Sequence, residues 1–158
     1  MTDATLLRHQ RWMALALDLA TQAGEAGEVP VGAVVVDAQD RILAQAANRR
    51  ETDGDPTAHA EVLALRAAGQ SLGHWHLAGC TLYVTLEPCP MCAGAIILSR
   101  IGLLVYGAED AKAGAVRSVL NLPDSAASNH RLAVLGGILG VPCGQQLQTW
   151  FAQRRKEC

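Results

Sequence analysis

The sequence alternates strand-like and helix-like segments, and this order restricts the fold more than any other feature. Residues 29–37 form a β-branched run, VPVGAVVVD, which is typical of a strand buried on both faces. A polar turn and a second strand over residues 41–48 indicate an antiparallel hairpin. The remaining pattern predicts strands over residues 81–87, 101–107 and 130–138, and helices over 5–24, around 59–67, over 90–100 and near the C-terminus. Together these segments predict an α/β fold, a three-layer α/β/α sandwich with a mixed five-stranded sheet.

The length of 158 residues suits one domain, and no repeat, low-complexity tract or linker divides the chain. Half of the residues are apolar, but only three Trp, two Tyr and one Phe are aromatic. The core must therefore be aliphatic. We expect a single domain over residues 1–158 that closes with a helix at about 143–156.

Charge and cysteine content restrict the class of protein. The formal net charge is −2, so any binding of nucleic acid has to depend on local basic clusters. No segment approaches the roughly 20 uncharged apolar residues of a transmembrane helix, and the N-terminus lacks a signal-peptide pattern. We therefore expect a cytoplasmic protein with no membrane partner. Five cysteines with one Cys-x-x-Cys pair then indicate metal binding or catalysis before disulfides.

The Cys-x-x-Cys pair lies where a helix is predicted to begin. Cys89 and Cys92 are three residues apart, which places both side chains on one helical face. Pro90 fits the first helical position, where its missing N–H costs nothing. Cys89 therefore lies at a helix N-terminus, where the positive end of the helix dipole favours a thiolate.

His59 and Glu61 lie near the predicted start of another helix, with Asp55 or Thr57 as a candidate cap. Residues two apart do not share a helical face. They can still converge on one point if the helix meets a metal end-on. One helix tip then supplies a nitrogen and a carboxylate, and the other supplies two thiolates.

His59, Cys89 and Cys92 would give zinc three protein ligands. A catalytic zinc site keeps its fourth position for water, and the metal lowers the pKa of that water to about 7. Glu61 could take the proton of the water and return it to a leaving group. Each element alone has another interpretation: a redox pair of cysteines, a capping or surface His, or a Glu that complements the helix dipole. Cys80 as a fourth ligand would make the site structural.

The HAE triplet and the later PCPMC form the His-x-Glu…Pro-Cys-x-x-Cys signature of zinc nucleobase deaminases. With EVPVGAVVV, NRR, SRIGLLVYGAEDAKAGA, NHR and WFAQRRKE, they make the sequence closely resemble the bacterial tRNA-specific adenosine deaminases of the cytidine deaminase superfamily. The resemblance runs over residues 11–156, nearly the whole chain.

The resemblance implies a cytidine deaminase-like fold and a homodimer that hydrolyses adenosine to inosine at the wobble position of a tRNA anticodon stem-loop, releasing ammonia. It implies one Zn²⁺ per subunit, bound by His59, Cys89 and Cys92, with Glu61 as the catalytic proton shuttle. The residues implied to contact the substrate are Asn48, Ala60, Asp110, Lys112, Asn129, Arg154 and Arg155.

The sequence departs from the family pattern in one loop, where DAKAGAVRS replaces the typical DAKTGAAGS and changes Ala113, Val116 and Arg117. It also carries Arg50 where proline is common. These departures concern the RNA-contacting loops and leave the zinc signature intact. The basic residues available to phosphates are Arg49, Arg50, Lys112, Arg117, Arg131, Arg154, Arg155 and Lys156.

Two other functions compete with this interpretation. A deaminase of a free nucleobase or nucleoside, such as cytosine, cytidine or guanine, would share the metal signature. A non-catalytic zinc-binding partner subunit would not need a proton shuttle, so Glu61 argues against it. The basic C-terminal helix, DAK and NHR favour tRNA. Iron could occupy the same ligands in vitro.

Overall fold

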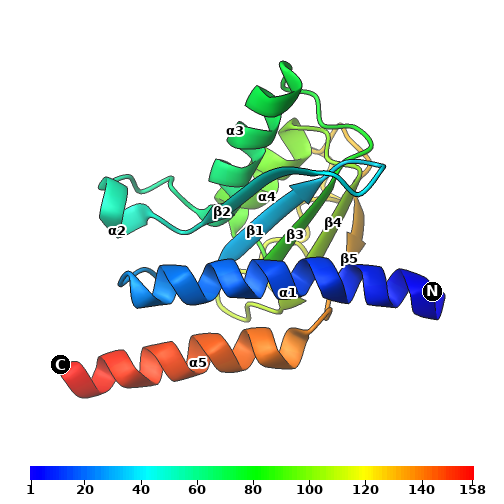
Figure 1. Ribbon diagram of the computed structural model, residues 1–158. Helices are drawn as coiled ribbons and strands as arrows, with labels where there is room; N and C mark the ends of the chain where they lie inside the picture. The colour runs from blue at the N-terminus through cyan, green and yellow to red at the C-terminus, as the bar shows by residue number, and fades with distance from the viewer.

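The computed structural model describes residues 1–158 as a five-stranded sheet between two layers of helices (Figure 1). None of the helices combines the length and the apolar composition needed to cross a bilayer. The elements in chain order are α1 (Asp3–Glu25), β1 (Gly32–Val36), β2 (Ile42–Ala47), α2 (Arg50–Asp53), α3 (Ala60–Leu72), β3 (Thr81–Leu86), α4 (Pro90–Leu98), β4 (Leu103–Ala108), β5 (Ala133–Leu135) and α5 (Gly140–Glu157).

The sheet is mixed, as the sequence predicted, with the strand order β2-β1-β3-β4-β5. β1 pairs antiparallel with both β2 and β3, whereas β3, β4 and β5 are parallel to one another. The hairpin thus joins the parallel half through its first strand. This confirms the three-layer α/β/α sandwich.

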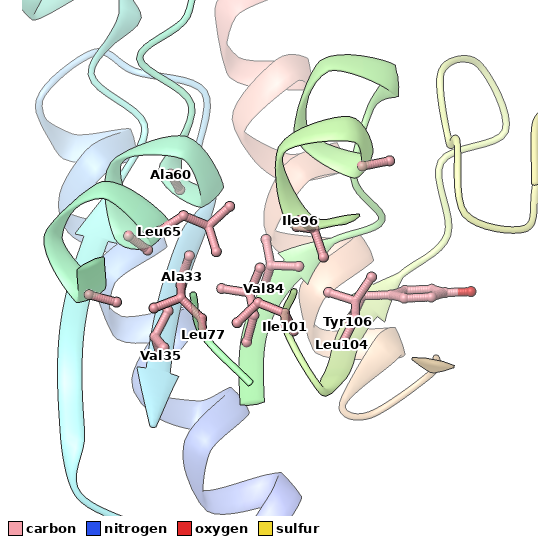
Figure 2. Packing of buried hydrophobic residues seen from close by; sticks show 14 of the residues in the cluster. Ala33, Val35, Ala60, Leu65, Leu77, Val84, Ile96, Ile101, Leu104 and Tyr106 are labelled. Atoms are coloured by element: carbon pink, nitrogen blue, oxygen red, sulfur yellow. The ribbon is translucent and has the colours of Figure 1, made fainter. Parts of the chain in front are cut away.

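The two helical layers account for the continuous burial of β1. Alternate side chains of a strand point to opposite faces. Ala33 and Val35 pack with α3, and Figure 2 shows them beneath Leu65, while Ile96 of α4 lies above Val84 in the same cluster. Val34 and Val36 belong to the second apolar cluster, which α1 and α5 cover from the opposite face. The larger cluster is almost wholly aliphatic, as the low aromatic content predicts, whereas the second contains Trp12 and Tyr83.

One close contact sets the start of β1 against α1. A Cβ atom on Gly32 would overlap the carbonyl oxygen of Ala16, so only glycine allows the strand this near to the helix. The backbone before Gly32 leads directly into the pocket described below. The packing of α1 therefore fixes one wall of that pocket.

The structure refines the predicted bounds in two places. α5 begins at Gly140 and not at Cys143, because the Cys143 N–H already donates to the Leu139 carbonyl at 3.0 Å. The polar loop between β2 and α3 contains the single turn α2, which an ion pair between Arg49 and Asp53 at 2.8 Å holds together.

Candidate active site

Two helix N-termini meet at one end of the sheet and carry the predicted metal ligands. His59 is the N-cap residue of α3, and Cys89 is the N-cap residue of α4 with Pro90 directly after it. Neither N-cap side chain caps its own helix, so both are free for another partner. Asp55 and Thr57 do not cap α3; the Asp55 carboxylate accepts the Thr57 N–H and hydroxyl in the preceding turn.

The ligand atoms have the spacing that one zinc ion needs. His59 Nδ1 lies 3.6 Å from Cys89 Sγ and 3.4 Å from Cys92 Sγ. Tetrahedral zinc with Zn–S near 2.3 Å and Zn–N near 2.05 Å requires an N···S separation of about 3.6 Å. All three ligand atoms lie within 4.8 Å of one another. The donor set therefore fits one zinc ion and leaves a fourth position open.

The two cysteines differ in acidity. A hydrogen bond from Cys92 outweighs the effect of burial and, with backbone N–H groups of α4 and His59, lowers the pKa of Cys89 to about 5. The Cys92 thiol donates a hydrogen bond to the Cys89 thiolate, which raises the pKa of Cys92, and burial raises it further. One ligand is thus already a thiolate at neutral pH, and a bound cation would displace the single proton of the pair.

Glu61 is the second residue of α3 and lies beside the ligands, almost completely buried. Burial raises the pKa of its carboxyl to about 7, with a further contribution from the Cys89 charge. Its own backbone N–H and His59 oppose the increase. A group that gives and takes protons near neutral pH suits acid–base catalysis, and a bound cation would favour its ionised, proton-accepting form.

A pocket of about 200 Å³ opens directly above the ligands. This is below the roughly 300–1,000 Å³ of pockets for drug-sized ligands and suits a single nucleobase removed from its stack. His59, Glu61 and Cys89 form its floor, while Cys92 is fully buried behind them. The other lining residues are Val29, Val31, Asn48, Arg50, Ala60, Leu86, Glu87, Asp110 and Ala113.

Asn48 is held in a fixed orientation at the wall of this pocket. Its side-chain amide donates to the Val29 carbonyl at 3.3 Å, and its Oδ1 accepts the Arg50 N–H at 3.2 Å. One amide hydrogen and one lone pair of Oδ1 are left for a ligand. Asn48, Ala60 and Asp110, three of the residues that the resemblance implied as substrate contacts, thus line the same pocket.

The structure places the other implied contacts outside the pocket. Lys112 is exposed in the turn after Asp110, whose carboxylate accepts its N–H at 3.0 Å. Asn129 accepts a hydrogen bond from the Arg100 guanidinium at 2.5 Å and lines a separate cleft. Arg154 and Arg155 are exposed in the last turns of α5.

Two buried carboxylates were missed by the sequence analysis. Glu87 lines the pocket and Glu28 lies behind its wall, and both are only 1% exposed. Burial alone would raise the pKa of each, but hydrogen bonds from Ser118, Asp110 and Arg117 to Glu87, and from Thr52 and Glu51 to Glu28, outweigh it and lower both values. The available signal was a carboxylate directly beside an apolar strand segment, in TLE and EVPV.

Cys80 takes no part in the site. It is buried in the apolar cluster before β3 and does not belong to the group of possible metal ligands. A fourth protein ligand is therefore absent, which excludes a closed four-ligand site of this composition.

Comparison with known proteins points in the same direction. Residues 7–108 match the family model of the cytidine and deoxycytidylate deaminase zinc-binding region. The chain is 47% identical to the tRNA-specific adenosine deaminase of Haemophilus influenzae, over 98% of this chain and 91% of the relative. A solved structure from studies of A-to-I editing by tRNA:A34 deaminases at the wobble position matches with a TM-score of 0.83 and 43% identity, over 86% of this chain and 98% of that one. The guanine deaminase of Nitrosomonas europaea matches with a TM-score of 0.76 and 27% identity, over 90% and 84%.

The ligand assignment can be tested with two cysteine variants. Cys92→Ala should weaken zinc binding by at least about 100-fold, because it removes a ligand and not only a supporting contact. Cys80→Ala, the matched change at a buried cysteine outside the site, should keep one zinc per chain. Metal content by mass spectrometry and the thiolate absorption of the Co²⁺ form measure both. If Cys92→Ala retains zinc, the ligand assignment is wrong. If Cys80→Ala loses zinc, Cys80 is a fourth ligand and the site is structural.

Proposed function

This chain belongs to the cytidine and deoxycytidylate deaminase family of zinc enzymes, and on that premise we propose that it hydrolyses adenosine to inosine at the wobble position of a tRNA anticodon. The observation that carries the proposal is the floor of the pocket, where His59, Cys89 and the buried Glu61 meet beneath a space for one base. The 47% identity to a tRNA-specific adenosine deaminase over nearly the whole chain supports this substrate.

The reaction exchanges the amino group of adenine for an oxygen from water and releases ammonia. Zinc bound by His59, Cys89 and Cys92 supplies a Lewis acid that makes water nucleophilic at neutral pH. Glu61 accepts the proton that water loses and donates it to the departing amino nitrogen. Asn48 orients the base through its free amide hydrogen and lone pair, and the buried walls exclude bulk water.

The competing substrate is a free base or nucleoside. The similarity to a guanine deaminase favours this alternative, because it shows that the same fold accepts a free purine. The identity to that protein is 27%, against 47% to the tRNA-specific relative. The balance therefore favours RNA.

A substrate panel tests the proposal. The zinc-loaded protein should form inosine in an anticodon stem-loop with adenosine at the wobble position, and should not act on free adenosine, cytidine, cytosine or guanine. Glu61→Gln should lower kcat about 10²–10⁴-fold, because it removes the proton acceptor, while zinc content stays unchanged. Nucleoside analysis by liquid chromatography and mass spectrometry measures the products. Turnover of a free base with the stem-loop untouched would overturn the RNA substrate, and zinc loss in Glu61→Gln would give Glu61 a structural role.

The basic residues needed for RNA lie near the pocket. Arg50 lines its rim, whereas the neighbouring Arg49 is held by Asp53 through three contacts of 2.8–3.1 Å. The C-terminal end of α5 lies beside the segment that leads into the pocket, because Trp150 donates to the Gly24 carbonyl at 3.1 Å and the Arg154 guanidinium reaches the backbone at Gly27. Arg117 is less available, since its guanidinium donates to the Val134 carbonyl at 2.9 Å.

Salt dependence of binding tests these contacts. The double change of Arg154 and Arg155 to Ala, and Arg50→Ala alone, should weaken stem-loop binding and flatten its salt dependence. Each lost phosphate contact removes about 0.7–0.9 from the slope of log affinity against log salt. Fluorescence anisotropy at several salt concentrations gives the slope, and Arg11→Ala, an exposed arginine of α1, is the control. A wild-type slope in the double variant would remove α5 from the RNA surface.

We further propose that the chain acts as one cytoplasmic domain and forms a homodimer. A single sheet links residues 32–135, and all five cysteines are free thiols, as expected in a reducing compartment. The dimer is supported by α4, an apolar helix whose Met91 and Leu98 are 37% and 68% exposed. Such exposed apolar side chains are frequent at interfaces between subunits.

Sedimentation tests the dimer. The wild type should sediment at twice 16.7 kDa, and Leu98→Lys should shift it toward the monomer, because a charge would be buried without a partner. Val141→Lys, an exposed apolar residue of α5 on the other side of the sheet, is the matched control and should remain dimeric. A monomeric wild type would refute the dimer.

A further inference from the structure

Two loops without long regular elements form the opposite walls of the pocket. The first, residues 48–59, contributes Asn48 and Arg50; the second, residues 109–118, contributes Asp110 and Ala113. Both loops must hold a fixed position if the pocket is to select one base. The apolar core reaches the second loop at Ala115 and Val116 but contains none of these four residues, so polar contacts have to complete their placement.

A single buried carboxylate holds the second loop. Glu87 Oε1 accepts the N–H groups of Arg117 and Ser118 at 2.7 and 2.9 Å. Its Oε2 accepts the Asp110 N–H at 3.0 Å and the Ser118 hydroxyl. No Lys, Arg or His forms an ion pair with this carboxylate, so N–H and O–H donors from the loop balance its charge.

The loop is also shaped to fit this carboxylate. A Cβ atom at Gly114 would overlap Glu87 Oε2, so only glycine allows the loop to close around it. The neighbouring Ala115 N–H donates to the Pro88 carbonyl at 2.9 Å. The loop is therefore attached to the segment that leads directly to Cys89, and its position is coupled to the floor of the pocket.

Glu28 holds the first loop in the same way. Its Oε1 accepts the Thr52 N–H at 2.6 Å and hydroxyl at 2.9 Å, and its Oε2 accepts the Glu51 N–H at 3.2 Å. It too forms no ion pair, although the charge of Arg50 helps to lower its pKa. Each wall of the pocket is thus fixed by one carboxylate, 1% exposed, that binds backbone N–H groups of the adjacent loop.

We propose that Glu87 is a substrate-positioning residue, which fixes Asp110 and Ala113 at one wall of the pocket while Glu28 fixes Asn48 and Arg50 at the other. This inference rests on the proposed deaminase function. It assigns to Glu87 and Glu28 the role of setting the width of the pocket. Neither carboxylate touches the reacting atoms. Their effect should therefore appear in how the substrate is bound and not in the chemical step.

Glu87→Gln is a sharp test because both carboxylate oxygens accept N–H groups. Whichever way the amide of Gln is turned, its NH₂ group faces an N–H donor of the loop. We expect KM to rise about tenfold, as for the loss of a charged hydrogen bond, with kcat within about twofold of wild type. Zinc content and the Co²⁺ spectrum should not change. Hydrogen exchange should accelerate at the amides of Asp110, Arg117 and Ser118.

The matched control is Glu109→Gln, which removes the same charge from an exposed side chain of the same loop and should leave KM and exchange unchanged. Ser118→Ala removes only the hydroxyl donor and should give a smaller rise in KM. This variant replaces Glu87→Gln in the test if Glu87→Gln does not fold. Glu28→Gln should raise KM with faster exchange at Glu51 and Thr52 instead.

The kinetic comparison uses whichever substrate of the panel the wild type converts, so that a wrong RNA substrate and a wrong role for Glu87 give different results. If the wild type converts a free base but not the stem-loop, only the RNA substrate is refuted. The positioning role is refuted if Glu87→Gln has the KM of the wild type. It is also refuted if the only effect is a fall in kcat that matches the fall in the fraction of folded protein.

Discussion

The site depends on two helices that begin at the same end of the sheet. One strand, β3, separates α3 from α4 in the chain, so the two helices run in the same direction on one face and their N-termini meet. Unpaired N–H groups and the positive ends of both dipoles point at one place. That place holds His59, Cys89, Cys92 and Glu61, of which three can carry negative charge. The N–H groups at the start of α4 and the hydrogen bond from Cys92 stabilise the Cys89 thiolate, whereas burial outweighs the helix N-terminus at Glu61 and raises the pKa of its carboxyl to about 7.

Buried negative charge is also stabilised by backbone N–H groups around the pocket, behind the metal ligands. Glu28 and Glu87 are buried anions that form no ion pair, and each is stabilised chiefly by N–H groups of a loop, with a smaller contribution from the Arg50 charge at Glu28. Negative charge therefore surrounds the floor of the pocket, although the proposed substrate is itself a polyanion. Arg50 at the rim and the Arg154 end of α5 place positive charge where phosphates would lie, outside the space for the base. Separation of the two signs makes the net charge of −2 compatible with the proposed RNA substrate.

Local spacing in the sequence was sufficient for the metal ligands but not for the pocket. Cys89, Pro90 and Cys92 define a helix start within four residues, and the buried run before Asp37 defines a central strand. His59 proved to be an N-cap and not a first-turn residue, because α3 begins one residue later. The burial of Glu87 could be suspected from its place beside an apolar strand, but its partners could not be predicted, since they lie 23–31 residues away in a loop without periodicity. The position of Asn129 outside the pocket could not be predicted either, because only tertiary packing places its loop against Arg100.

The three departures in the loop after β4 have different structural consequences. Val116 is buried in the larger apolar cluster, so it affects packing and not the substrate. Arg117 directs its backbone N–H to Glu87 and its guanidinium to the Val134 carbonyl, which attaches the loop to β5. Only Ala113 faces the pocket. Two of the three changes therefore concern the attachment of the loop to the body of the protein, and the pocket lining differs from the family pattern at Ala113 and, in the other loop, at Arg50.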